Sequence, residues 1–271
     1  MEAESVLTEE RMSKVLFLES IDSTNLFLKN ISEEAPDRQV VMADEQTRGR
    51  GRLGRSFESP KNKGIYLSYL MRPSSIPEDT ALITAWTAVA VCRAVKKICN
   101  IEPGIKWVND LILNNKKFCG ILTEMDIDEH GKIRSLIIGI GVNVNEDTGD
   151  LDAALKDKAT SLKQELGREI NRNVLAFEII RELDRMYDDW PDEKEGYLNE
   201  YRRYSIMTGK DVSVTRIAVT DDKDLEAYKK RYGRVLGIGD DFSLTVEFDD
   251  GSRENLNAGE VSVRGMYGYA R

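Results

Sequence analysis

The 271-residue sequence has one histidine, three cysteines and no long apolar run, and each shortage excludes a class of protein. His130 alone leaves no second histidine for an HExxH metal site and disfavours a Ser-His-Asp triad. Cys92, Cys99 and Cys119 are too few and too scattered for a disulfide framework, and no CxxC pair indicates zinc. Cys92 and Cys99 are expected to fill the core. Without a run of about 18 apolar residues or a secretion signal, we expect a cytoplasmic protein with no membrane span.

The chain also lacks an excess of positive charge, because its formal net charge is -9. This disfavours a general nucleic-acid binder, since neutralising phosphates supplies most non-specific affinity for DNA or RNA. Against that background, EQTRGRGRLGR at 45–55 gathers four arginines and three glycines. Glycines let a loop close and present backbone N–H groups, while arginines bind phosphate or carboxylate bidentately. The segment therefore predicts a confined anion site, with a loop that is mobile when empty and closes over anions as a lid.

Within this arginine loop, GRGRLG at 49–54 satisfies GxGxxG, but its context excludes two common interpretations. A dinucleotide-binding fingerprint needs a helix directly after the glycines, and here a polar stretch and a strand follow. A protein kinase would need HRD and DFG motifs, which the sequence lacks. A solvated, RNA-binding RG segment stays open as an alternative, although expected strands at both ends tether the loop.

Hydrophobic patterning predicts three strands and two helices before residue 104, and the arginine loop connects the second strand to the third. The expected strands are KVLFLES at 14–20, QVVMADEQ at 39–46 and GIYLSYLMRP at 64–73. A helix is expected from DSTNLFLKNI, with Asp22 or Ser23 as its N-cap. Another is expected from Pro77 to Asn100, which has acidic residues in its first turn, lysines in its last and abundant alanine.

After residue 104 the pattern predicts an antiparallel meander, two helices and a small β-rich tail. The meander strands are GIKWVNDLIL at 104–113, KFCGILTEMDID at 117–128 and IRSLIIGIGVNVN at 133–145. SLKQELG is expected to be a helix ended by Gly167, followed by a long helix from Asn173 to Trp190. From about Ile206 short strands follow, with a DDG hairpin and a charged insert at 217–231.

A second polar cluster lies in the expected meander. Lys106, Asn109 and Asp110 fall on its first strand, and Lys117 begins the second. Alternation places Lys117 on one side with the residues Cys119, Ile121 and Thr123. A lysine at the start of an otherwise apolar row needs a negatively charged partner, so Lys117 is predicted to bind an anion. The alternatives are a turn lysine for Lys117 and a turn-capping acid for Asp110, with Trp107 in the core.

Five motifs, taken together and in this order, resemble the biotin protein ligases. They are DSTN at 22–25, EQTRGRGRLGR at 45–55, KWVNDL at 106–111, KKFCGIL at 116–122 and GIGVNVN at 139–145. The resemblance implies an α+β fold: a mixed-sheet catalytic domain related to class II aminoacyl-tRNA synthetases, and a small C-terminal SH3-like barrel. We expect these domains at residues 1–204 and 205–271.

The resemblance implies a two-step reaction. Biotin and ATP, with Mg²⁺, give biotinoyl-5′-AMP, and the biotinyl group then passes to a lysine of a biotin carboxyl carrier protein. A lipoate ligase is the nearest alternative. The chain has no room for the N-terminal winged helix of many relatives, so DNA binding is not expected. A homodimer is possible.

The site residues that the resemblance implies fall into three overlapping groups. For biotin they are Ser23, Thr24, Asn25, Gln46, Arg50, Gly51, Arg52 and Lys117. For ATP they are Arg52, Arg55, Asn109, Lys117 and Asn143. The implied catalytic residues are Lys117, Arg52 and Asp110, and Asp110 is also the implied Mg²⁺ ligand. Two positions depart from the family pattern: Val108 replaces the proline of KWPNDL, and Phe57 stands near a common tryptophan.

Overall fold

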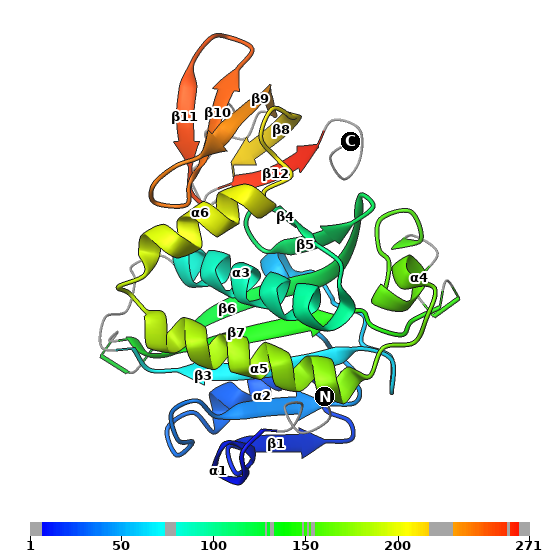
Figure 1. Ribbon diagram of the computed structural model, residues 1–271. Helices are drawn as coiled ribbons and strands as arrows, with labels where there is room; N and C mark the ends of the chain where they lie inside the picture. Colours follow the sequence, from blue (N-terminus) through cyan, green and yellow to red (C-terminus); the bar gives the residue numbers. More distant parts are fainter. Residues whose placement is uncertain are drawn as a thin grey trace.

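The structure, a computed structural model, describes residues 7–73, 80–127, 129–130, 133–147, 149–150, 152, 155–216, 230–258 and 261–265. Two β sheets organise these residues, a seven-stranded one in the order β1-β2-β3-β7-β6-β5-β4 and a five-stranded one in the order β11-β10-β9-β8-β12 (Figure 1). In the larger sheet β1 and β2 are parallel and the other neighbours are antiparallel. The predicted fold class, a large mixed sheet with helices and a small C-terminal sheet, is confirmed.

The elements have the following bounds. The large sheet contains β1 (Val15–Leu18), β2 (Val40–Ala43), β3 (Ile65–Met71), β4 (Gly104–Lys106), β5 (Asp110–Leu113), β6 (Lys116–Ile127) and β7 (Ile133–Val142). The small sheet contains β8 (Asp211–Arg216), β9 (Arg231–Ile238), β10 (Leu244–Phe248), β11 (Arg253–Leu256) and β12 (Val261–Gly265). The helices are α1 (Glu9–Met12), α2 (Thr24–Asn30), α3 (Thr80–Cys99), α4 (Leu162–Leu166), α5 (Arg172–Asp189) and α6 (Lys194–Tyr204), with a 3-10 turn η1 (Arg52–Gly54).

Several predicted helix ends are confirmed by their caps. Ser23 is the N-cap of α2, and its side chain accepts a hydrogen bond from the Leu26 amide. Gly167 ends α4 in the left-handed conformation, with φ 66°. α3 lies within the predicted helix, whose first residues are outside the described ranges. The insert at 217–231 lies outside them as well, apart from its last two residues.

The prediction of one continuous strand at 104–113 was wrong. GIKWVNDLIL forms two short strands, β4 and β5, which pair antiparallel with Lys106 opposite Asp110. A turn at 107–109 separates them, and the Trp107–Val108 peptide bond is cis. Trp107 and Val108 are buried although they belong to a turn. Their apolar side chains are typical of a strand, which is why the sequence pattern predicted one there. The helices α1 and α6 and the strand β12 were also not predicted.

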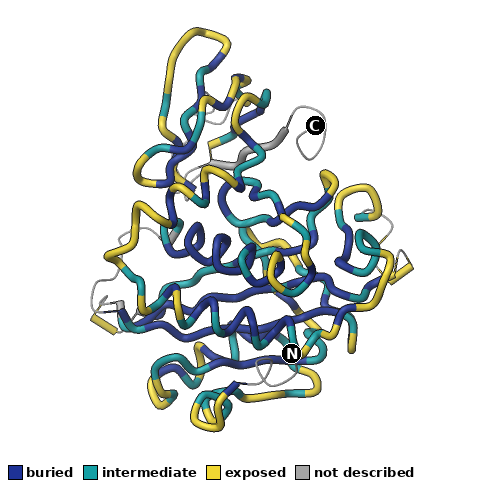
Figure 2. Tube along the Cα trace, viewed as in Figure 1, coloured by how far each residue is buried: buried dark blue, intermediate teal, exposed yellow. Residues whose placement is uncertain are grey.

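The large sheet has two different faces (Figure 1). α3 and α5 cover one face, where Leu67, Tyr69 and Met71 of β3 join the main core. α2 covers the other face, where Leu70 joins a small cluster and Ser68 binds the start of α2. The dark core in Figure 2 follows the sheet and the covering helices, and it contains the two predicted core cysteines of α3.

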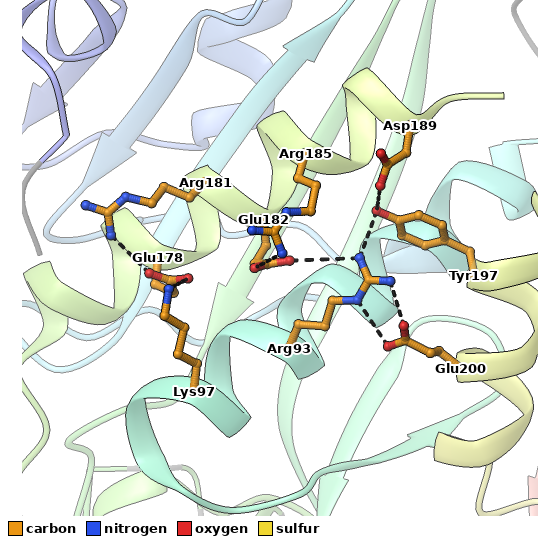
Figure 3. Close-up of polar contacts among 9 residues, drawn as sticks. All are labelled: Arg93, Lys97, Glu178, Arg181, Glu182, Arg185, Asp189, Tyr197 and Glu200. Atoms are coloured by element: carbon orange, nitrogen blue, oxygen red, sulfur yellow. Dashed lines mark hydrogen bonds and ion pairs between the residues drawn. The ribbon is translucent and has the colours of Figure 1, made fainter. Parts of the chain in front are cut away.

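An ion-pair network joins α3 with α5 and α6 (Figure 3). Arg93 of α3 donates to both carboxylate oxygens of Glu200 in α6, at 3.1 and 2.7 Å. Lys97, one turn further along α3, pairs with Glu178 of α5 at 2.7 Å. Charged side chains therefore connect these three helices to one another. Across the described ranges, no helix has both the length and the apolar character to span a membrane.

The small sheet packs against α6 and the 107–109 turn. The Trp107 indole donates to the Phe242 carbonyl at 2.9 Å, and the Tyr201 ring meets the Phe242 ring edge-on at 5.5 Å. Arg202 of α6 also donates to the Ile238 carbonyl. The two sheets are thus joined beside the turn that precedes β5.

One buried carboxyl makes stability depend on pH. Glu146 follows β7 and accepts from the Tyr66 hydroxyl at 3.4 Å, and burial raises its pKa from the ordinary 4.5 to about 7. Because the folded state binds this proton more tightly than the unfolded state, the stabilisation is complete below about 4.5 and is lost as pH rises towards 7. The expected loss is at most about 3 kcal/mol.

Glu146→Gln should therefore flatten the pH dependence of the unfolding free energy between about pH 4.5 and 7.5 relative to the wild type. Urea titrations at several pH values measure the difference between the two proteins. An identical slope in both would show that Glu146 does not titrate in this range.

Candidate functional site

The site begins as a bare patch on the α2 face of the central strands. Gly120 of β6 and Gly139 and Gly141 of β7 present no side chains there. A Cβ at Gly139 would lie 2.2 Å from the Asn25 Oδ1, and a Cβ at Gly141 would lie 2.6 Å from the Phe57 ring. Real Cβ atoms do not tolerate such distances, so the glycines are required for the start of α2 and the arginine loop to approach the sheet.

Two adjoining cavities contain every predicted site residue. Ser23, Thr24, Asn25, Gln46 and Arg50 line the cavity over the glycines, which we call the inner cavity. The outer cavity lies beside it and is lined by Arg55, Asp110 and Asn143, among others. Gly51, Arg52, Asn109 and Lys117 line both, together with Phe57. The arginine loop and the KWVNDL segment, about 50 residues apart in the chain, thus meet where the cavities join.

The wall of the inner cavity is a connected hydrogen-bond network. The Thr24 amide and hydroxyl donate to the Gln46 Oε1 at 2.9 and 3.1 Å, and the Gln46 Nε2 donates to Ser59. Ser68 of β3, fully buried, lies 2.5 Å from the Asn25 Oδ1 and 2.8 Å from the Thr24 hydroxyl. These contacts fix the polar groups at the start of α2 in one arrangement.

The arginine loop is folded as an irregular hairpin. Arg50 and Ser56 form an antiparallel bridge, and the Gly51 amide donates to the Arg55 carbonyl at 2.7 Å. Its four arginines point to different surroundings. Arg50 pairs with Glu124, Arg52 reaches the cavity junction, Arg55 is exposed on the outer cavity, and Arg48 lines neither cavity. Closure of the loop on anions stays a prediction.

Lys117 lies at the junction, but not in the row that its sequence spacing predicted. The register of β5 and β6 shifts so that Leu111 pairs with Cys119 and Ile112 with Lys117. Lys117 consequently shares a face with Gly120, since a Cβ there would lie 2.8 Å from its Nζ. The expected companions of Lys117, namely Cys119, Ile121 and Thr123, face α3 instead, where Thr123 is hydrogen-bonded to Thr84.

Asp110 holds the ammonium of Lys117 at 2.6 Å, and both side chains are mostly buried. Beside them, the Asn109 amide donates to the Ile121 carbonyl at 3.1 Å, while its Oδ1 accepts from Arg52 at 3.3 Å. Arg52 also donates to the carbonyl of Ala258, which follows β11 of the small sheet. The junction is therefore built from the loop, the 107–109 turn and the C-terminal sheet.

The outer cavity is positive although the chain is acidic. Five basic side chains and two acidic ones line it, and these are Arg52, Arg55, Lys106, Lys117, Lys158, Glu58 and Asp110. Such a concentration of cations favours an anionic ligand. Asn143, one of the residues implied for ATP, is buried here, and its Nδ2 donates to the Thr160 carbonyl at 3.0 Å.

Sequence reasoning missed several residues that build the site. Ser68, Glu124 and Lys158 lie outside the five motifs, so the sequence predicted no role for them. One available signal was the glycine pair at 139 and 141, which leaves one face of an apolar strand without side chains. Trp107 also lines the outer cavity, in addition to its expected burial.

Comparisons with known proteins agree on one family. The model of the biotin/lipoate A/B protein ligase family matches residues 17–143. Biotin–protein ligase 2 of Arabidopsis thaliana is 33% identical over 257 residues, which cover 89% of this chain and 74% of that protein. The chain belongs to the biotin protein ligase family. The bifunctional ligase/repressor BirA of Bacillus spizizenii is likewise 33% identical, over 93% of this chain and 74% of its own length.

A solved structure of the family has the same fold. The biotin protein ligase from Aquifex aeolicus in complex with biotin and ATP matches with a TM-score of 0.78 and 25% identity, covering 93% of this chain and 98% of that one. The match extends over most of the chain, so it supports the fold of this biotin protein ligase family member as a whole.

Gly139→Ala tests the close approach of α2 to the sheet. The added Cβ would lie 2.2 Å from the Asn25 Oδ1 and should displace that side chain from its hydrogen bonds. We expect a destabilisation of about 2 kcal/mol, measured by urea unfolding. Gly237→Ala in β9 is the control, because a Cβ there would meet nothing within 4 Å. Equal stability of the two variants would contradict the close approach.

Proposed function

We propose that this chain activates biotin with ATP, giving biotinoyl-5′-AMP and pyrophosphate, and then transfers the biotinyl group to a lysine of a biotin carboxyl carrier protein. The observation that carries the proposal is the meeting of a hydrogen-bonding cavity and a cationic cavity at Lys117 and Arg52. Biotin has a neutral polar ring and an anionic tail, and ATP is anionic. The polarity and charge of the two cavities match these ligands, which supports a binding mode in which the reacting ends meet at the junction.

In the proposed binding mode biotin occupies the inner cavity. The hydroxyls and amides of Ser23, Thr24, Asn25 and Gln46 supply donors and acceptors for its ureido ring, because these groups already form a connected polar wall. Arg50 and the backbone at Gly51 cover the ligand from the loop. The biotin carboxylate then points to the junction, where Lys117 and Arg52 lie.

The first step joins two anions. A carboxylate oxygen of biotin attacks the α-phosphorus of ATP, and the bond between that phosphorus and the pyrophosphate oxygen breaks. No base is needed, since the carboxylate is already ionised. Lys117 and Arg52 stabilise the negative charge that accumulates in the transition state. Arg55, Asn109 and Asn143 hold the nucleotide in the outer cavity.

The second step transfers the biotinyl group. The amine of the acceptor lysine attacks the acyl carbon of the mixed anhydride, and AMP leaves with the bonding electrons. The amine must lose a proton first, and Asp110 lies at the junction where it can orient the amine and accept that proton. Lys117 and Asp110 lie 2.6 Å apart, so the groups proposed for the first and second steps are in direct contact.

A Mg²⁺ ion fits the outer cavity as a companion of ATP. Within the described part of the chain no three His, Cys, Asp or Glu side chains gather as a metal-binding group. Mg²⁺ bound to nucleotides commonly takes only one or two protein carboxylates and completes its shell with phosphates and water. Asp110 and Glu58 line the cavity and would hold it, and the ion would neutralise phosphate charge.

The proposal also includes a division of the chain. Residues 1–204 form the catalytic domain and 205–271 an SH3-like domain, supported by the separate strand sets of the two sheets. A lipoate ligase activity is the alternative within the matched family model. Exchange of radiolabelled pyrophosphate into ATP decides between them: exchange that depends on biotin supports the proposal, and exchange that depends only on lipoate refutes it.

Lys117→Ala should slow biotin-dependent pyrophosphate exchange by about 10²-fold or more, because a charge acting on the transition state is lost. The neighbouring Lys116→Ala is a matched control, since Lys116 contacts the Lys156 carbonyl and lines neither cavity. A Lys117→Ala rate equal to that of the control would remove Lys117 from the mechanism.

Arg52→Ala should speed release of the adenylate by about tenfold, because a bidentate cation at the junction is lost. Release is measured by chasing labelled adenylate with unlabelled biotin and ATP. Arg48→Ala, in the same loop but outside both cavities, should release at the wild-type rate. Unchanged release from Arg52→Ala would show that the loop does not hold the intermediate.

A further inference from the structure

Glu124 of β6 stands where the arginine loop, the start of α2 and the central sheet meet. Its Oε1 lies 3.2 Å from the Arg50 Nη2, and its Oε2 lies 3.5 Å from the Arg50 Nη1. The same Oε2 accepts from the Asn25 Nδ2 at 2.9 Å. One carboxylate thus binds the loop and the wall of the inner cavity at once.

We propose that Glu124 is a positioning residue for the biotin half of the reaction: it ties the arginine loop to the wall of the inner cavity and fixes the Asn25 amide. The inference rests on the proposed function, since it assigns the inner cavity to biotin. Glu124 itself does not line that cavity, so it acts through Asn25 and Arg50, which do.

The contacts of Asn25 show how the carboxylate sets its orientation. An amide nitrogen has two donors, and here one reaches the Leu122 carbonyl at 3.2 Å and the other reaches Glu124. With both donors directed to β6, the Oδ1 is turned towards Ser68 and Gly139. An absent side chain at 124 removes the acceptor that favours this orientation over a flipped amide. A glutamine there weakens the preference, because its oxygen is uncharged and its nitrogen can donate to a flipped Asn25 instead.

The contacts of Arg50 show how the carboxylate holds the loop. Two guanidinium nitrogens face two carboxylate oxygens, an arrangement that fixes direction as well as distance. The Glu124 side chain is 22% exposed and that of Arg50 is 46% exposed, so solvent weakens the pair without separating it. Glu124 also compensates the charge of Arg50, as Asp110 compensates that of Lys117, so the carboxylate limits repulsion between Arg50 and the other cations near the junction.

The test compares steady-state constants of the full chain with Glu124→Gln, which keeps the shape of the side chain but loses its charge. We expect the KM for biotin and the release rate of the adenylate to rise about tenfold. The KM for ATP and the kcat at saturating biotin should stay within about twofold. Glu33→Gln, an exposed acid paired with Arg134, is the control and should change neither constant.

A double-variant cycle separates the tie from a general weakening of the fold. Arg50→Gln should raise the KM for biotin as well, and the double variant Arg50→Gln/Glu124→Gln should be no worse than the poorer single one. Single effects that multiply, or a Glu124→Gln protein with wild-type constants, would overturn the proposal. If the wild type itself shows no biotin-dependent exchange, the proposed function fails, whatever Glu124 does.

Discussion

The close approach of α2 and the arginine loop to the central strands is the constraint on which the site depends. Gly139 and Gly141 make it possible, because any side chain there would meet Asn25 or Phe57 well inside van der Waals contact. The opposite face of the same strand carries Ile138, Ile140 and Val142, all packed in the main core. β7 is therefore a support on one side and a cavity floor on the other, and its alternation of apolar residues with glycine encodes both.

Positive side chains gather around that floor, although the net charge of the whole chain is negative. The outer cavity gathers cations, yet each of two basic groups near the junction has an acidic partner: Asp110 for Lys117 and Glu124 for Arg50. Such partners hold the cations in place while the site is empty and limit their mutual repulsion. A ligand that brings its own negative charge then competes for prearranged donors, and less reorganisation is needed at the moment of reaction.

Much of the site could be predicted from the sequence, and the predictions that were wrong or missing have identifiable physical causes. The resemblance of five motifs to the biotin protein ligases implied residues that the structure brings into two adjoining cavities. The predicted face of Lys117 was wrong, because a register shift between β5 and β6 interrupts the regular alternation of side chains between the two faces of the sheet. The roles of Ser68 and Glu124 were missed because each is an isolated polar residue in a strand, and only the approach of a distant segment gives it a partner.

The C-terminal sheet contributes more than an appended unit would. Its Ala258 carbonyl accepts from Arg52, and its Phe242 carbonyl accepts from Trp107, which lines the outer cavity. Arg52 is thereby held between Asn109 in the turn before β5 and a loop of the second sheet. A shift of that sheet would move the Ala258 carbonyl away from the arginine at the junction. The position of the arginine loop is consequently set by contacts from both sheets, although the residues that bind the ligands belong to the first.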